Sequence, residues 1–263
     1  MKRSKILVIL FFLIILLPVL SLLPWIFMQR WQWPDILPAE WTMRGVESIF
    51  AKEKNWGTLI ASSVWLSTVV SFLSVVIALM SSRAMLHYDF IGKRSLYPIF
   101  LLPFIIPSTV FGMGGQVMFL KLGLGRKFLG VVIVHLIYSL PYATKLLYDG
   151  TKHFGQSLEE QALVLGADRW QSFWRISLPS LAPVILSAMS MSFIISFSQY
   201  FLTLIIGGGK IRTFSVVMVP YLHGGERSIA AAYSVVFLGI CLTVFAIFEI
   251  LIAHLVKKRS LTK

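Results

Sequence analysis

The sequence is poor in charge and in cysteine. Only 13% of its 263 residues are charged, against about a quarter in a typical soluble domain, and 57% are hydrophobic. The single cysteine, Cys241, excludes an intramolecular disulfide, and its apolar neighbours indicate a small buried side chain. The stretches between apolar runs are too short to build a sizeable soluble core. Because the apolar residues form long runs instead of spaced stripes, the sequence indicates an integral membrane protein.

Patterns typical of catalysis, metal binding or nucleic-acid binding are also missing. The net charge is +13, but no basic block alternates with aromatic residues, so nucleic acid is not expected as a partner. The histidines are widely separated, with no two-histidine zinc helix and no C-x-x-C pair. The stretch Gly207–Lys210 lacks the first glycine of a Walker loop and the Ser or Thr that follows its lysine. We therefore expect no catalytic residue, no metal site and no cofactor bound by this chain.

Six apolar runs are long enough to cross a hydrocarbon core, which requires about 20 helical residues. They lie at roughly 6–28, 57–82, 96–120, 128–148, 182–206 and 230–256. The first follows a basic start, but it is too long for a signal peptide and no A-x-A cleavage site follows it. With that start inside, Lys and Arg are moderately enriched on the inner side. These features predict a multi-pass protein of the bacterial cytoplasmic membrane, with both termini in the cytoplasm.

The longest cytoplasmic segment in this topology, residues 149–181, predicts a hairpin of two short helices. Ser157 is expected as the N-cap of the first helix, with Glu160 at its third position in a capping box. Gly166 is expected to end this helix, because glycine adopts the left-handed conformation at little cost. One apolar face of the helix is expected to contain Leu158, Ala162 and Leu165.

The second helix of the hairpin is expected to start at Asp168, which serves as its N-cap. Pro179 marks either the end of this helix or the entry into the fifth spanning helix. One face of it is strongly aromatic, with Trp170, Phe173 and Trp174. Such side chains must pack on the helix bundle or enter a groove of a partner protein.

The hairpin resembles the hallmark of a known family, the permease subunits of binding-protein-dependent ABC importers. That hallmark reads E-A-A-x3-G-x9-I-x-L-P in the last large cytoplasmic loop. The sequence departs from it at Gln161, where the family has alanine, a change that helix geometry tolerates. It matches at the same spacing at Glu160, Ala162, Gly166, Ile176, Leu178 and Pro179.

This resemblance implies an all-α membrane protein with the MetI-like permease fold, six transmembrane helices and a cytoplasmic coupling-helix hairpin. It implies an N-terminal helix at 1–30, a transport core at 57–256 that includes the coupling loop 155–179, and a basic cytoplasmic tail at 257–263. In the family, the hairpin docks into a cleft of the ATPase. The implied ATPase-coupling residues are Glu160, Gln161, Ala162, Gly166, Ala167, Asp168, Ile176, Leu178 and Pro179.

The resemblance further implies a permease subunit of an ATP-driven importer, and not an enzyme. Its implied protein partners are an ABC ATPase dimer that binds ATP and Mg, a second permease subunit, identical or different, and an extracytoplasmic substrate-binding protein. The stretch from Phe197 to Gly209 looks most similar to the polyamine, iron(III) and thiamine branch of the family. The implied cargo is a small solute of that kind.

Polar residues inside the spanning segments are candidates for the translocation path, because polar groups are costly in a membrane. Ser192, Ser196 and Gln199 recur at the spacing of one helical face, and His135 and Tyr138 lie in the fourth segment. The alternative is that these residues form hydrogen bonds between packed helices.

Two other classes of protein compete with the importer hypothesis. A channel or secondary transporter needs no ATPase, and it would be expected to place charged or unwound elements at mid-membrane. The sequence shows no obvious pair of such elements. An intramembrane protease could use His135 with Ser190, Ser192, Ser196 or Ser198, but no G-x-S-x-G elbow is present.

Overall fold

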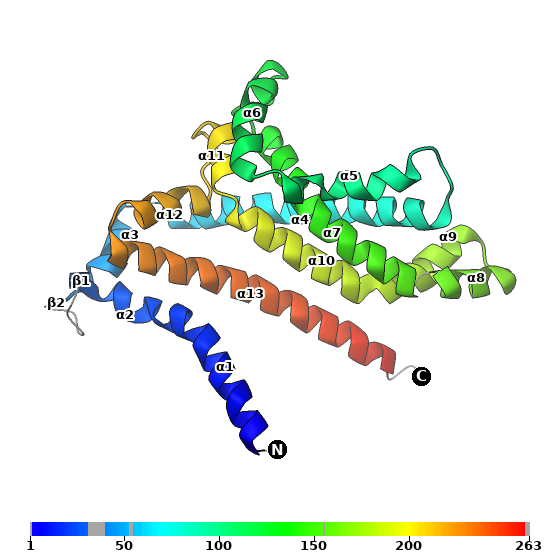
Figure 1. Ribbon diagram of the computed structural model, residues 1–263, viewed down its shortest axis with the longest axis horizontal. Coiled ribbons are helices and arrows are strands. Elements are labelled where there is room, and N and C mark those ends of the chain that lie inside the picture. The colour runs from blue at the N-terminus through cyan, green and yellow to red at the C-terminus, as the bar shows by residue number, and fades with distance from the viewer. Residues whose placement is uncertain (1, 31–39, 53–54, 155, 261–263) are drawn as a thin grey trace. The chain divides into compact units, whose positions relative to one another are not determined.

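The computed structural model describes residues 2–30, 40–52, 55–154 and 156–260 (Figure 1). Over these ranges the chain is helical except for one antiparallel pair of short strands, β1 (Met28–Arg30) and β2 (Glu40–Trp41), and the connecting turns. The chain packs as two units. The first contains Met1–Leu59 and Val216–Leu242, and the second contains Ile60–Ser215 and Thr243–Lys263.

The first unit contains α1 (Lys2–Leu20), α2 (Leu22–Ile26) and α3 (Arg44–Lys52), together with parts of three other helices. These are the start of α4 (Trp56–His87), most of α12 (Phe214–His223) and the first half of α13 (Arg227–Ser260). The hydroxyl of Ser228 donates to the Ile26 carbonyl at 2.8 Å, which joins α13 to α2. Tyr233 stacks on both Trp56 and Tyr221, with ring centroids 5.4 and 5.1 Å apart. A stack of three aromatic side chains therefore joins α4, α12 and α13 within this unit.

Four helices in the described ranges are long and apolar enough to span a membrane: Trp56–His87, Phe128–His153, Arg169–Ser198 and Arg227–His254. They correspond to the second, fourth, fifth and sixth predicted segments. The predicted first segment is divided between α1 and α2, and its described apolar part, Leu10–Ile26, is shorter than these. By length and composition the described residues supply four spans, or five with one bent pair, instead of the six predicted.

The predicted third segment, 96–120, is not one continuous helix. It forms α5 (Lys93–Ile105) and α6 (Ser108–Lys121), which meet at an angle of 104°. Ile106 and Pro107 between them are extended, because proline lacks an N–H and disfavours helical geometry in the residue before it. The hydroxyl of Tyr138 donates to the Ile106 carbonyl at 3.3 Å. This hydrogen bond gives a partner to the Ile106 carbonyl, which lies at the bend, where the helix is interrupted.

The predicted fifth segment, 182–206, is also broken. It begins earlier, within α10 (Leu178–Ser198), and continues after a break as α11 (Phe201–Gly207). Gln199 has extended backbone geometry, although no proline is nearby. The sequence showed no obvious unwound elements, but within the described residues both the third and the fifth predicted segments are broken by extended backbone. The glycines after this segment form its turn, with Gly208 left-handed.

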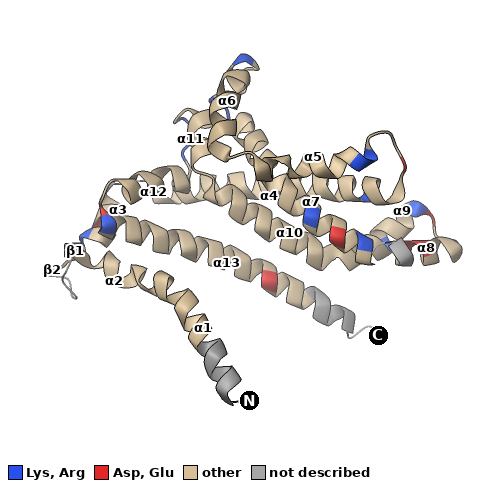
Figure 2. Cartoon of the chain, viewed as in Figure 1, with Lys and Arg blue, Asp and Glu red and all other residues tan. Residues whose placement is uncertain are grey.

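The second unit is held together by α4, α10 and α7 (Phe128–Phe154), which pack along one another (Figure 1). Gly150 lets α7 approach α10, because a Cβ at this position would come within 2.8 Å of Val184. Charged residues in this unit gather at the helix ends, whereas the middle of α4, α7 and α10 carries few (Figure 2). Small buried residues line the packed face of α4, namely Ser67, Ser71, Ser74, Ala78 and Ser82.

Candidate functional site

The predicted hairpin is present and comprises α8 (Gln156–Val164), α9 (Arg169–Ser172) and the π-helical turn η1 (Phe173–Ser177). Gly166 ends its first helix with a φ of +91°, as predicted. The N–H of Gly166 donates to the Leu163 carbonyl and the N–H of Ala167 donates to the Ala162 carbonyl, both at 3.0 Å. These two bonds form a Schellman motif, which fixes the direction of the turn.

The second limb of the hairpin begins at the residue predicted to cap it. Asp168 is extended, and its Oδ1 accepts a hydrogen bond from the Gln171 N–H at 2.7 Å. The predicted cap of the first helix differs, because α8 already begins at Gln156, and the side chain of Ser157 lies outside the described residues. One of the two predicted N-caps is therefore confirmed.

The second limb continues without interruption into the long helix α10. The helical path runs from Arg169 to Ser198, so Pro179 lies within it, in the first turn of α10. Pro179 has no N–H to donate to the Arg175 carbonyl, and its ring crowds that carbonyl. The wider π-helical turn η1 lies directly before α10, where this crowding occurs. In this turn the Leu178 N–H donates to the Phe173 carbonyl. The hairpin and the spanning helix thus form one continuous element.

A buried carboxylate connects the two limbs of the hairpin to α4. Glu159 is only 8% exposed, and Arg83 on α4 donates to both of its oxygens, with Nη1–Oε1 at 2.5 Å and Nη2–Oε2 at 3.2 Å. The hydroxyl of Ser177 donates to the same carboxylate from η1. His87 Nε2 lies 3.7 Å from Oε2. Sequence reasoning missed this cluster, because it selected the neighbouring Glu160.

The ionisation of Glu159 follows from these contacts. Burial raises the pKa of this carboxyl, but the hydrogen bonds from Arg83 and Ser177 and the charge of Arg83 together outweigh burial. The pKa of Glu159 therefore lies below its ordinary value. The residue is a carboxylate at neutral pH, which the bidentate guanidinium contact requires.

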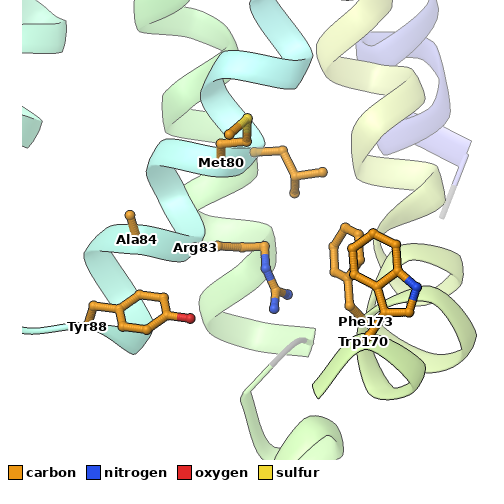
Figure 3. A pocket seen from close by; sticks show the side chains of 7 residues that line it. Met80, Arg83, Ala84, Tyr88, Trp170 and Phe173 are labelled. Atoms are coloured by element: carbon orange, nitrogen blue, oxygen red, sulfur yellow. The ribbon is translucent and has the colours of Figure 1, made fainter. Parts of the chain in front are cut away.

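Arg83 also contacts the aromatic face of the hairpin. Its guanidinium carbon lies 4.5 Å from the centroid of the Phe173 ring. Figure 3 shows Arg83 extending from α4 toward Phe173 and Trp170. Between α4 and the hairpin lies a cavity of about 320 Å³, lined by Leu79, Met80, Arg83, Ala84, Tyr88, Trp170 and Phe173. The aromatic residues predicted to pack on the bundle or on a partner thus face α4 in part, although Trp170 is 70% exposed.

The predicted coupling residues divide into an exposed and a packed group. Ala162 is buried, and Ala167, Ile176 and Leu178 are half-buried. The exposed residues of the set are Glu160, Gln161, Gly166, Asp168 and Pro179. One expectation about the first helix is wrong, because Leu165 follows the end of α8 and is 87% exposed instead of sharing a packed face with Ala162. Val164 is equally exposed, so the tip of the hairpin is apolar.

The candidates for the translocation path lie around the two helix breaks. His135 is fully buried, with Nδ1 2.9 Å from the Ser196 hydroxyl and Nε2 2.8 Å from the Thr203 hydroxyl. Gln199 does not share a helical face with Ser196, because α10 ends before it. Ser192 is also buried, and Tyr138 donates to the bend between α5 and α6. Their role in a path remains a prediction.

The contact of His135 with Ser196 has the composition of a protease dyad but not its accessibility. Ser196 is 2% exposed and His135 is inaccessible. The second ring nitrogen of His135 is engaged by Thr203. A peptide substrate cannot reach this serine in the structure.

The chain is similar to permease proteins of known transport systems. It is 27% identical over 151 residues to a probable sulfate transport system permease protein of Chlorokybus atmophyticus. The aligned region covers 53% of this chain and 51% of that protein. The chain thus spans about half the length of that relative. It is 25% identical over 198 residues to a spermidine/putrescine transport system permease homologue of Mycoplasma genitalium. This aligned region covers 72% of this chain and 69% of the relative.

The fold also matches a solved structure. A chain from the crystal structure of a bacterial alginate ABC transporter, in complex with an alginate pentasaccharide-bound periplasmic protein, superposes with a TM-score of 0.60. The match covers 94% of this chain and 92% of that chain at 17% identity. The predicted fold class, a helical permease fold, is therefore confirmed.

A family description fits the greater part of the sequence. Residues 71–260, which include both helix breaks and the whole hairpin, match the model of the binding-protein-dependent transport system inner membrane component. This match extends well beyond the six hairpin positions that suggested the family. The chain therefore belongs to that family, the transmembrane permease subunits of ABC importers.

Proposed function

We propose that this chain forms the translocation path of an ATP-driven importer together with a second permease subunit, identical or different. An extracytoplasmic binding protein delivers the solute, and an ATPase dimer binds ATP and Mg. The hairpin formed by residues 156–177 inserts into a cleft of that ATPase. This assignment extends the family membership to the partners and to the residues that contact them.

The observation that carries the proposal is the apolar tip of the hairpin. Val164 and Leu165 are each 87% exposed at the end of a helix whose turn is fixed by backbone hydrogen bonds. Burying such a side chain in a protein groove contributes about 1.5–3 kcal/mol. The exposed charges of the hairpin balance, with the carboxylates of Glu160 and Asp168 against the guanidinium groups of Arg169 and Arg175, so it has no basic excess that an anionic lipid surface would attract. A protein cleft is the better partner.

The construction of the hairpin suits the transmission of motion. A floppy loop would absorb a displacement of the ATPase, whereas a capped hairpin that continues into a spanning helix transmits it. Asp168 caps the start of the second limb, and the helical path from Arg169 onward is unbroken to Ser198. Movement of the tip therefore displaces α10 directly.

The cargo of the importer is a separate matter. The relatives named above are a sulfate permease and a spermidine/putrescine permease, whose solutes have opposite charges. The permease fold thus serves either sign of charge, and selectivity is expected to lie in the binding protein. We propose a small solute, with a polyamine, iron(III) or thiamine as the first to test. The direct test is to identify the solute that the binding protein carries.

Docking is tested by placing a charge at the tip. Leu165→Asp should abolish co-purification of the ATPase, because a desolvated carboxylate opposes burial, while membrane insertion is unchanged. Ile91→Asp is the matched control, since Ile91 is fully exposed in the turn between α4 and α5. Unchanged recovery of the ATPase with Leu165→Asp would rule out docking through this tip.

The orientation requires its own measurement. In a Cys241→Ala background, Gln161→Cys should react with a membrane-impermeant maleimide only in inside-out vesicles, because we place the hairpin in the cytoplasm. Lys121→Cys at the end of α6 should react only in right-side-out vesicles. The reversed pattern would contradict both the topology and the ATPase contact.

A further inference from the structure

We infer that Arg83 is a positioning residue that ties the hairpin end of α4 to the hairpin through Glu159, so that displacement of the hairpin moves α4 together with α10. This inference rests on the proposed function, since it concerns the motion that the ATPase imposes. It assigns a role to two residues outside the set that the family hallmark marks.

The contacts of Glu159 join three segments at one point. The residue itself is on α8, Arg83 binds it from α4, and Ser177 binds it from η1. The sequence separation between Arg83 and Glu159 is 76 residues, so the ion pair is a tertiary connection and not a local one. The carboxylate closes the base of the hairpin and attaches that base to α4.

Arg83 contacts both limbs of the hairpin. Its two Nη atoms bind Glu159 on the first limb, and its guanidinium lies over the ring of Phe173 on the second. A planar, delocalised cation can make a bidentate contact and a stacked contact together, whereas a lysine ammonium cannot. These two contacts fix the position of both limbs of the hairpin relative to α4.

A buried ion pair is a poor source of net stability but a good source of a unique arrangement. Its Coulombic gain is largely offset by desolvation, whereas the fork of two hydrogen bonds tolerates little sliding. The side chain of Glu159 is 10% exposed and that of Arg83 is 23% exposed. The apolar cavity beside Arg83 would allow the hairpin to slide if apolar contacts alone held it. We therefore assign the pair to alignment of the hairpin with α4.

The test uses the complete transporter in lipid nanodiscs with a Cys241→Ala background. Spin labels are placed on Ile91→Cys, in the turn after α4, and on Leu122→Cys, directly after α6; both positions are exposed. In the parent protein, Mg and a non-hydrolysable ATP analogue should shift the distance between the labels by up to about 5 Å, the range of known helix shifts. Glu159→Gln and Arg83→Lys should each abolish this shift, while the ATPase stays bound and hydrolyses ATP.

The neighbouring ion pair of Asp89 and Lys93 is the control. Its two charged atoms lie 2.8 Å apart, but Asp89 is fully exposed, so Asp89→Asn should leave the shift intact. A full distance shift in Glu159→Gln overturns the inference. Loss of the bound ATPase from Glu159→Gln and Arg83→Lys also overturns it, because the ion pair would then be part of the docking surface. Failure of the proposed function is distinguishable, because Leu165→Asp would then retain the ATPase.

A charge exchange provides a second test if Glu159→Gln is not inserted into the membrane. The double variant Arg83→Glu with Glu159→Arg restores an ion pair between the same two helices. Recovery of the shift on addition of the nucleotide analogue supports the inference. An inserted and assembled double variant without any shift overturns it.

Discussion

Replacing Thr203 with valine removes one hydroxyl from the network that bridges the break between α10 and α11. This hydroxyl donates to the Gln199 carbonyl at 2.6 Å, so its oxygen accepts the bond from His135 Nε2–H at 2.8 Å. The proton of the imidazole is therefore on Nε2, and Nδ1 accepts from the Ser196 hydroxyl at 2.9 Å. Valine has nearly the same shape as threonine but leaves Nε2–H without a partner.

The magnitude follows from the bonds lost. A hydrogen bond between membrane helices contributes about 0.6 kcal/mol on average. A buried donor left unpaired costs about 1–3 kcal/mol more, and His135 is inaccessible to solvent. Thr203→Val should thus lower the free energy of unfolding by about 2–4 kcal/mol. Thr203→Ser keeps the hydroxyl and loses one methyl, which costs about 1 kcal/mol.

The assay is reversible unfolding of the purified chain in mixed micelles, with the three proteins compared under the same conditions. Circular dichroism reports the helix content as the denaturing detergent increases. If the hydroxyl is what matters, valine is the more damaging replacement in spite of its better shape. Equal loss in both variants, or a greater loss with serine, would refute the hydrogen-bond account and leave packing as the explanation.

Three further predictions concern the hairpin and its neighbouring helices. Gly150→Ala should destabilise the fold by about 1–3 kcal/mol, because the new Cβ would clash with Val184. Gly114→Ala on α6 is the control and should not destabilise the fold, because its Cβ would meet no atom within 4 Å. Thermal unfolding of the two variants measures the difference. The pKa of Glu159 in the folded protein lies below its ordinary value of 4.5. Ionised Glu159 therefore stabilises the fold fully above pH 4.5, and this contribution is lost as the pH falls through the folded-state pKa. The melting temperature of the parent protein should fall in acid for this reason, and Glu159→Gln should not show this fall. Asp168→Ala should cost about 1 kcal/mol and speed amide exchange at Gln171, and unchanged exchange would exclude the cap.

The turn of the hairpin could be predicted because its determinants are local. Gly166 must be left-handed and Asp168 must accept from the third residue after it, and both requirements are visible within a few positions of sequence. Four of the six predicted spanning segments correspond to long helices for a similar reason, since each contains a long apolar run. Local signals of this kind hold whatever the rest of the chain does.

The helix breaks could not be predicted because no local signal separates them from ordinary kinks. Pro103 and Pro141 lie inside continuous helices, whereas Pro107 stands at a bend of 104°. The break at Gln199 has no proline, and His135 from another helix forms hydrogen bonds with residues on both sides of it. Which residues satisfy the freed backbone is decided by tertiary packing.

Adjacent glutamates illustrate the same limit within the candidate site. Glu159 and Glu160 have the same chemistry, and the family hallmark directs attention to the second. In the structure the first is buried against Arg83 and the second is exposed. Successive helical residues point about 100° apart, so the outcome depended on the position of α4, which the hairpin sequence does not contain.

Under the proposed function, the unbroken helix from Arg169 to Ser198 would act as a lever. Its 30 residues correspond to a rod of about 45 Å. If such a rod tilts by roughly 5° about its hairpin end, its far end moves by about 4 Å, comparable to one helical turn. That far end adjoins Gln199, where the chain changes direction. In the importer proposed above, a slight rocking of the ATPase would thus become, at the opposite end of this helix, a displacement large enough to open or close a passage for a small solute.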